Sequence, residues 1–301
     1  MDSPLEGRAT QTPGALDPMR VMSLERFVVE SRDLTLMAFF AHPDDEAFGT
    51  GGTLARYGRE GCQVYLVTAT RGEAGEIVVP DLTTPANLPF VRERELRCAC
   101  EIYGIHPPRF LEYPDGLLAI IHQGQAVGKL VRLIRELRPH VLVTFGPDGI
   151  YGHYDHIAVH RWAAIAFDLA ADPECFPGQL DEECTPHQID KLYYRVLSEE
   201  RVNAMSEEEG RAAVMMDGVP FPIVGHPQDE ITTVIDVSDF AEAKLSGLLC
   251  HVSQVGYDAP FGETPDEIVK EPWFLQETFS LARSTMGAAA EPETDLFAGL
   301  R

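Results

Sequence analysis

The six residues TLMAFF, at positions 35–40, form a nearly continuous apolar run that ends in the polar stretch AHPDDE at 41–46. A short run of this kind is typical of a β-strand that is buried on both faces of a sheet. The stretch GTLARYGREG at 52–61 follows, and its pattern predicts a helix that ends at Gly61. Together they predict the first strand-helix unit of a parallel sheet.

The same alternation of apolar runs and amphipathic segments continues along the chain. Strands are predicted at 62–70, 109–113, 140–145, 191–197 and 231–237, and helices at 91–105, 124–139, 154–171 and 239–254. Alternating strands and helices form a parallel sheet that is covered by helices on both faces. The sequence therefore predicts an α/β fold with a Rossmann-like, doubly wound, mostly parallel sheet and a smaller C-terminal α+β portion.

The ends of the chain differ in composition from its middle. Residues 1–20 are rich in Pro, Gly, Ser and Thr, which predicts a flexible N-terminal arm. A single α/β domain is expected at 21–285, with an acidic, Pro-containing insert at 172–188 that precedes a C-terminal part at 190–285. Residues 286–301 are expected to form a tail.

The net charge of −24 makes nucleic acid an unfavourable partner, because an acidic surface repels phosphate backbones. No apolar run approaches the ~20 residues that a membrane-spanning helix needs. The first residues lack the basic and apolar segments of a secretory signal, so a cytoplasmic protein is expected. The sequence does not decide between a monomer and a homo-oligomer.

The six cysteines contain no C-x-x-C pair, and they are interpreted as reduced thiols of a cytoplasmic protein. Cys175 and Cys184 share one loop, so they are the pair that could join in an oxidising setting.

Polar loops follow the first four predicted strands. They read AHPDDE at 41–46, RGEAGE at 71–76, YPDG at 113–116 and GPDGIYGHYDH at 146–156. The carboxyl ends of parallel strands meet at one edge of a sheet, where such folds bind ligands. The sequence therefore predicts that the four loops line one shared pocket.

Two of these loops carry residues that bind metal ions. His42 and Asp45 are three positions apart, and the fourth loop adds His153 and His156, with His160 one helical turn further. Catalytic zinc sites use three protein ligands of the His and Asp type plus water. Either cluster alone could equally be a polar turn or a helix cap, because Asp is a good N-cap residue. Two such clusters, each after a buried strand, favour a metal site.

The motif AHPDDE with a Gly-rich helix start, followed about a hundred residues later by GHYDH, resembles the PIG-L / LmbE-like family of zinc-dependent de-N-acetylases. The resemblance extends from about Leu34 to Gln254, and its main departure is Tyr154, where the family often has Pro. It implies removal of the N-acetyl group from N-acetylglucosamine-containing small molecules, such as precursors of mycothiol and bacillithiol.

The resemblance also implies roles for single residues. His42, Asp45 and His156 match the zinc ligands, although His and Asp side chains also bind Fe²⁺ and other divalent ions. Asp44 matches the catalytic base, because a carboxylate that binds the metal cannot also be a free base.

Further catalytic roles are implied for three residues of the fourth loop. His153 would stabilise the tetrahedral intermediate or protonate the leaving amine, Asp155 would orient or tune His153, and Tyr151 would lie over the reacting carbonyl.

Arg92, Asp115 and Glu46 are the expected substrate-binding residues. Arg92 and Asp115 match positions that bind sugar hydroxyls, while Glu46 is also expected to hydrogen-bond a backbone or neighbouring group.

Three other functions remain open. The stretch GTGGTL at 49–54 follows a strand, but it does not fit the G-x-G-x-x-G pattern of a nucleotide-binding module. An amidase for a thiol-cofactor conjugate and a non-catalytic metal- or sugar-binding protein are the alternatives of similar fold. The aglycone is expected to contact 172–188 and 216–230. His251 and Gln254 are expected to form part of the pocket wall or to end their helix.

Overall fold

The computed structural model describes residues 33–301 except 211, 217, 258–263 and 288–291, so the predicted arm at 1–20 lies outside the described residues. Its main sheet has the strand order β3-β2-β1-β4-β5-β9-β8. The strands are β1 (Thr35–Phe40), β2 (Gln63–Thr68), β3 (Arg109–Phe110), β4 (Val141–Phe145), β5 (Lys191–Arg195), β8 (Thr233–Asp236) and β9 (Gln276–Ser284). The first five are parallel, and β9 pairs antiparallel with both β5 and β8.

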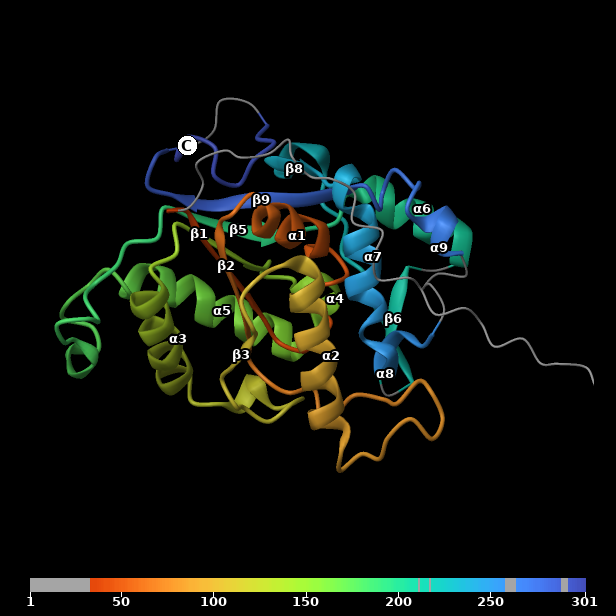
Figure 1. Ribbon diagram of the computed structural model, residues 1–301, viewed down its shortest axis with the longest axis horizontal. Helices are drawn as coiled ribbons and strands as arrows, with labels where there is room; N and C mark the ends of the chain where they lie inside the picture. The colour runs from red at the N-terminus through yellow and green to blue at the C-terminus, as the bar shows by residue number, and fades with distance from the viewer. Residues whose placement is uncertain (1–32, 211, 217, 258–263, 288–291) are drawn as a thin grey trace, which may run out of the picture.

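Helices cover both faces of this sheet (Figure 1). On one face lie α1 (Gly51–Arg59), α2 (Leu88–Tyr103) and α7 (Ala241–Leu249), and on the other lie α3 (Gln123–Leu137) and α5 (Tyr154–Leu169). Strands β1 and β4 are buried along their whole length, which explains why their sequences read as apolar runs instead of alternating patterns. The predicted doubly wound α/β class is confirmed.

The sheet reverses its strand order between β1 and β4. The chain leaves β1 to form β2 and β3 on one side, and it returns to form β4 on the other side. Such a switch point opens a crevice at the carboxyl ends of the two strands, where ligands bind in doubly wound sheets. The loops after β1 and β4 are the two that carry the candidate metal ligands.

The smaller C-terminal portion is also present. It comprises α6 (Glu199–Glu209), the hairpin of β6 (Ala213–Met216) and β7 (Val219–Pro222), α8 (Val252–Val255) and α9 (Pro265–Ile268). The sequence pattern missed β9, because its inward positions include the charged but buried Glu277 beside Phe279. Glu277 accepts hydrogen bonds from the first turn of α1, at the backbone nitrogens of Gly52 and Thr53.

Residues 292–301 do not form the loose tail that the sequence suggested. The side chains of Leu296 and Phe297 are fully buried in the main core. Glu293 forms an ion pair with the buried Lys191 at 2.6 Å and hydrogen-bonds Tyr193. These contacts tie the end of the chain to β5, and a segment this short, which mixes polar and apolar residues without a helix or strand period, gave little sequence signal for them.

The insert at 172–188 is mostly exposed, and Arg135 of α3 holds its first residues in place. This fully buried guanidinium donates hydrogen bonds to the carbonyl oxygens of Ala170, Asp172 and Cys175. A buried arginine without such acceptors would be strongly destabilising, so Arg135 fixes the start of the insert.

The interpretation of all six cysteines as reduced thiols is wrong in one respect. Cys98 of α2 and Cys250, directly after α7, form a disulfide across 152 positions of sequence. The packing of α2 against α7 brings them together, and no sequence spacing reveals such a contact. Cys175 and Cys184 remain free thiols.

Among the described residues, no helix is long and apolar enough to span a membrane.

Candidate metal centre and active site

Asp45 closes the turn that follows β1. Its Oδ2 accepts hydrogen bonds from the backbone N–H groups of Ala41 and His42, at 3.2 and 2.7 Å. The helix α1 begins only at Gly51, with Thr50 as its N-cap, so the motif is not the helix cap that was its main alternative. The turn holds His42 and Asp45 side by side at the carboxyl end of β1.

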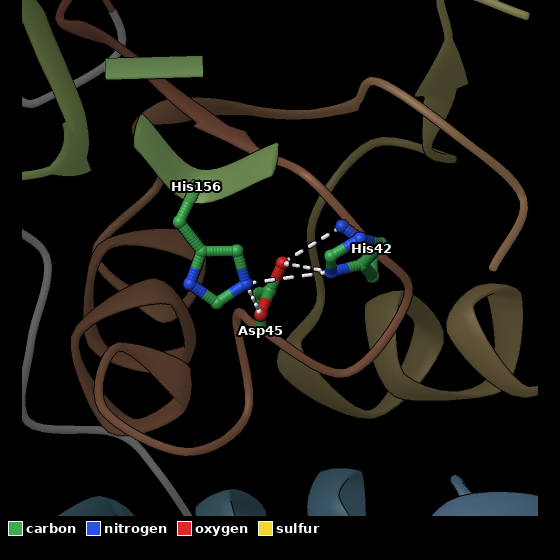
Figure 2. Close-up of side chains that lie close together, drawn as sticks. All are labelled: His42, Asp45 and His156. Atoms are coloured by element: carbon green, nitrogen blue, oxygen red, sulfur yellow. Dashed lines mark hydrogen bonds and ion pairs between the residues drawn. The ribbon is translucent and has the colours of Figure 1, made fainter. Parts of the chain in front are cut away.

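His42, Asp45 and His156 each direct a possible donor atom to one point, and these donor atoms all lie within 4.8 Å of one another, as a donor triangle in which either oxygen of Asp45 can take part (Figure 2). His42 Nδ1 lies 3.5 Å from Asp45 Oδ2, His156 Nε2 lies 3.3 Å from Asp45 Oδ1, and the two ring nitrogens are 3.4 Å apart. A tetrahedral zinc ion with bonds of ~2.0–2.2 Å places its donor atoms about 3.3–3.5 Å apart. The residues present therefore fit a divalent ion with three protein ligands.

The second ring nitrogen of each histidine is also held. His42 Nε2 lies 3.0 Å from an oxygen of Asp115, and His156 Nδ1 lies 3.1 Å from the carbonyl oxygen of Gly149. Metal-binding histidines generally donate their other N–H to a carboxylate or carbonyl, which fixes the ring and its tautomer. This arrangement leaves His42 Nδ1 and His156 Nε2 to face the ion.

Asp155 does not orient His153 through a side-chain contact, which was one of the two roles expected of it. Its fully buried carboxylate accepts hydrogen bonds from the backbone nitrogens of Gly116 and Leu118, and one oxygen lies 3.4 Å from His42 Nε2. Instead, the backbone N–H of Asp155 donates to His153 Nδ1 at 3.1 Å. The Asp155 side chain thus braces a metal ligand, and its charge acts on His153 only through space.

Asp44 is held in a strained backbone conformation beside the metal ligands. Its φ of 119° is rare for a residue with a side chain and costs of order 1–3 kcal/mol. Arg92 donates a hydrogen bond to its carboxylate at 3.1 Å and another to the carbonyl oxygen of Pro43. Burial raises the pKa of Asp44, the Arg92 charge lowers it, and the result is about 6.

Glu46 lies behind the site and is only 1% exposed, so the expectation that it binds substrate is wrong. One carboxylate oxygen accepts the backbone N–H of Asp44 at 3.0 Å, and the other lies 2.7 Å from Nε2 of the fully buried His251. The expected hydrogen bond to a backbone group is present. The two contacts of Glu46, with Asp44 on one side and His251 on the other, therefore stabilise the strained turn.

His153 and Tyr151 face the metal ligands from the loop after β4. The His153 ring stacks on the His156 ring, with 4.6 Å between centroids, and lies 4.9 Å from that of His42. Burial and the neighbouring imidazoles lower the pKa of His153 to about 4. Burial and the nearby carboxylates, first that of Asp45, raise the pKa of the Tyr151 hydroxyl.

The sequence matches the protein family described as "PIG-L: GlcNAc-PI de-N-acetylase" over residues 37–167. A relative from Streptomyces avermitilis, named 1D-myo-inositol 2-acetamido-2-deoxy-alpha-D-glucopyranoside deacetylase, is 37% identical over 302 residues. That match covers 89% of this chain and 98% of the relative. The chain belongs to the PIG-L family.

Other comparisons agree with membership of the PIG-L family. A mycothiol S-conjugate amidase from Streptomyces coelicolor is 34% identical, with 89% of this chain and 98% of the relative covered. Among solved structures, the N,N'-diacetylchitobiose deacetylase of Pyrococcus horikoshii has a TM-score of 0.62 at 19% identity, over 87% of this chain and 88% of that chain. At this identity, the structural likeness shows the fold alone.

A cavity of about 430 Å³ opens above the metal centre of this PIG-L protein. Its wall includes Asp44, Tyr151 and His153 together with the three metal ligands, as the converging loops predicted. The far wall comes from the C-terminal portion and is largely apolar. It is formed by Val196, Leu197, Met205, Val214, Ile223, Leu248, Trp273 and Phe274.

Arg92 and Asp115 both line the cavity, but each is already engaged. Arg92 holds Asp44 and also donates to the carbonyl oxygen of Gly72 at 2.8 Å. Asp115 contacts His42 and accepts the backbone N–H of Ala74 at 2.8 Å. Burial raises the pKa of Asp115, but the hydrogen bond and charge of His42, with the Ala74 N–H and the Arg92 charge, together outweigh it and bring the pKa to about 2. Arg92 and Asp115 therefore help to position Asp44 and His42, and they also form part of the cavity wall.

Among the residues left open by the sequence, Gln254 lines the cavity, whereas His160 does not. His160 Nδ1 lies 3.1 Å from the carbonyl oxygen of Phe145, which is a packing role. No residue of the insert 172–188 lines the cavity, so the expectation that it reads the aglycone is wrong, while Ile223 of 216–230 does line it.

Sequence reasoning missed Arg195, Lys244 and Trp273, which also line the cavity. Arg195 could have been found, because it is the polar residue at the carboxyl end of a predicted parallel strand. Lys244 lies within a helix and Trp273 within a loop, where no pattern marks them.

Proposed function

We propose that this chain hydrolyses the N-acetyl amide of an N-acetylglucosamine-containing small molecule, which releases acetate and a free amine. The observation that carries the proposal is the position of Asp44. A purely structural metal site has no use for a second carboxylate in a strained turn, within a cavity and outside the donor triangle.

His42, Asp45 and His156 would hold the ion, and zinc is the proposed metal. A divalent ion in this site supplies Lewis-acid chemistry: it polarises the amide carbonyl and makes a water molecule more acidic. The donor set of two nitrogens and a carboxylate suits zinc and also suits Fe²⁺.

Asp44 is the proposed general base. Its carboxylate would take a proton from the attacking water and return it to the amine nitrogen as the C–N bond breaks. Arg92 keeps this carboxylate in place through a hydrogen bond at 3.1 Å. The balance of the reaction is one water consumed, with its hydroxyl on the acyl carbon and its proton on the amine.

His153 is the proposed hydrogen-bond donor to the carbonyl oxygen. Its Nδ1 accepts the backbone N–H of Asp155, so in the neutral ring the hydrogen sits on Nε2. A neutral donor stabilises negative charge that develops on the oxygen. This geometry favours the first of the two roles that the family resemblance left open, and the hydroxyl of Tyr151 would assist from the same wall.

The substrate to test first is the one that the relatives' names give, an N-acetylglucosaminide of inositol. A second candidate is the amide of a thiol-cofactor conjugate, and the largely apolar far wall of the cavity favours it specifically. A relative at 34% identity carries the name of such an amidase.

The test is acetate release from N-acetylglucosaminyl inositol, with appearance of the free amine followed in parallel. Metal-loaded protein is expected to release acetate and amine in equal amounts. The variant Asp44→Asn is expected to keep its metal and lose at least a hundredfold in rate. Near-normal turnover by Asp44→Asn with normal metal content would refute the assignment of the base.

The cytoplasm is the proposed compartment, because Cys100, Cys175 and Cys184 remain free thiols, and the first and last of them are buried. The Cys98–Cys250 disulfide argues for an oxidising setting. Alkylation of thiols at the moment of cell lysis, followed by mass spectrometry, would decide between the reducing cytoplasm and an oxidising compartment. A disulfide found quantitatively closed in the cell would contradict the cytoplasmic proposal.

A further inference from the structure

Arg195 is a buried cation that faces the cavity at the end of β5. The residue is only 8% exposed and belongs to the cavity wall. Among the interactions of the described residues, its guanidinium donates one hydrogen bond, from Nη2 to the carbonyl oxygen of Phe48 at 3.2 Å, and it forms no ion pair. A guanidinium has five N–H donors, so most of those of Arg195 remain available to hydrogen-bond a ligand in the cavity.

Two other cations of the wall differ from Arg195 in this respect. Arg92 pairs with Asp44 at 3.1 Å, and Lys244 pairs with Glu277 at 3.0 Å. Burying a charged group without a partner is costly, and such a group is retained where a ligand supplies the partner.

Gly49 leaves the space that the Arg195 guanidinium occupies. A Cβ added at Gly49 would collide with the Nε, Cζ and Nη2 atoms of Arg195. Glycine at this position therefore lets the guanidinium lie against the loop that follows the metal-binding motif. The hydrogen bond to Phe48 in the same loop fixes its orientation.

The charges of the cavity wall favour an anionic ligand. Four carboxylates line it, those of Asp44, Asp45, Asp115 and Glu277, and four cations balance them, Arg92, Arg195, Arg201 and Lys244. A divalent ion would add two positive charges to this balance. The cavity would then be positive within a protein whose net charge is −24.

We propose that Arg195 is the centre of an anion subsite, which binds a carboxylate or phosphonate-type oxyanion carried by the substrate next to the scissile amide. The planar fork of a guanidinium matches such groups with two parallel hydrogen bonds. The proposal rests on the proposed function in that the ligand is an acylated glucosamine derivative.

The strand order shows where the Arg195 guanidinium lies relative to the candidate metal centre. Along the sheet edge, Asp115 follows β3 on one side of the metal centre, and Arg195 ends β5 on the other side (Figure 1). Val196 and Leu197 line the cavity directly after Arg195. The anion therefore lies beside an apolar part of the wall, and the group that carries it is either the acyl group or the aglycone.

The experiment measures binding to the full, metal-loaded chain by isothermal titration calorimetry. The reference probe is methyl N-ethylglucosaminide, whose amine linkage cannot be hydrolysed. One anionic probe replaces the N-ethyl group with N-carboxypropyl, and the other replaces the methyl aglycone with carboxypropyl. Phosphonate forms of both distinguish the type of anion, and the two probes distinguish its position.

At least one anionic probe is expected to bind tenfold or more tightly than the reference. Arg195→Gln is expected to abolish this preference while its affinity for the reference stays within threefold. The control Arg283→Gln, on the neighbouring strand β9 and outside the cavity, is expected to retain the preference. Equal affinities for all probes, or a preference that survives in Arg195→Gln, would overturn the proposal.

Arg195→Lys keeps the experiment decisive if Arg195→Gln does not fold. The lysine keeps the charge and loses the fork, so a reduced preference is expected, and an unchanged one would count against the subsite. Binding is measured without turnover, so its outcome is independent of acetate release. Failure of the proposed function and failure of this subsite are therefore separate results.

Discussion

Replacing Glu46 with glutamine tests whether the support beneath the catalytic turn controls activity. Glu46 is buried, and both of its oxygens accept hydrogen bonds, one from the backbone N–H of Asp44 and one from His251. Glutamine has nearly the same size, but it offers only one acceptor oxygen. Its amide nitrogen would replace one of the two acceptor oxygens, so at least one of the two hydrogen bonds to a carboxylate is lost.

The magnitude follows from these two contacts. Hydrogen bonds to a charged acceptor contribute about 1.5–3 kcal/mol each, and one of the two is lost in Glu46→Gln. We expect a loss of about 3 kcal/mol in the free energy of unfolding. The φ of 119° at Asp44 is then less firmly held, so the base moves and the rate falls about 10- to 100-fold, with metal content unchanged.

Urea unfolding, metal analysis and acetate release on the same preparations measure the three quantities. Glu101→Gln, an exposed position on α2, is the control and is expected to behave like the wild type. A Glu46→Gln variant with wild-type stability and rate would show that the Asp44 turn does not depend on this support. Loss of the metal would instead place Glu46 among the residues that build the ligand triangle.

Three further changes test other parts of the structure. His156→Ala is expected to lose the bound metal in plasma emission analysis, while His160→Ala keeps it; metal retained at full occupancy by the first would refute the ligand triangle. Phe297→Ala is expected to lower the free energy of unfolding by about 3–5 kcal/mol, because its ring is fully buried, and a change below about 1 kcal/mol would mean that the chain end is loose. Burial lowers the pKa of His251, but the charge and hydrogen bond of Glu46, with the charges of Asp44 and Glu95, together raise it above its ordinary value, so this pair stabilises the fold fully below about pH 6.5 and less as the pH rises through the folded pKa. The stability difference between wild type and His251→Gln should therefore shrink as the pH rises above about 6.5, and a difference that grows would contradict the assigned pair.

The fold was predictable because its central strands are buried on both faces. The boundaries of β1 agree with the predicted run TLMAFF at 35–40, and the polar loops after β1 and β4 converge at the switch point. Strand β9 was not predictable in the same way, since the buried Glu277 breaks its apolar pattern to meet the start of α1. The partners of a buried charge depend on tertiary contacts that no local pattern contains.

The candidate site shows the same division. The three candidate metal ligands lie in two short motifs, and the structure brings their donor atoms together. The contacts of the neighbouring carboxylates could not be predicted from the sequence. Asp155 faces His42 instead of His153, and Glu46 faces away from the cavity, because side-chain direction depends on the strained turn at Asp44. Sequence spacing alone does not specify such a turn.

The disulfide between Cys98 and Cys250 makes a covalent ring of the intervening chain. This ring contains strands β3, β4 and β5 and the exposed insert at 172–188. A protease that nicks the insert would therefore yield two fragments that stay joined and migrate together until a reductant is added. The crosslink would also keep cavity-lining residues before the nick, such as His156, and after it, such as Arg195, within one molecule.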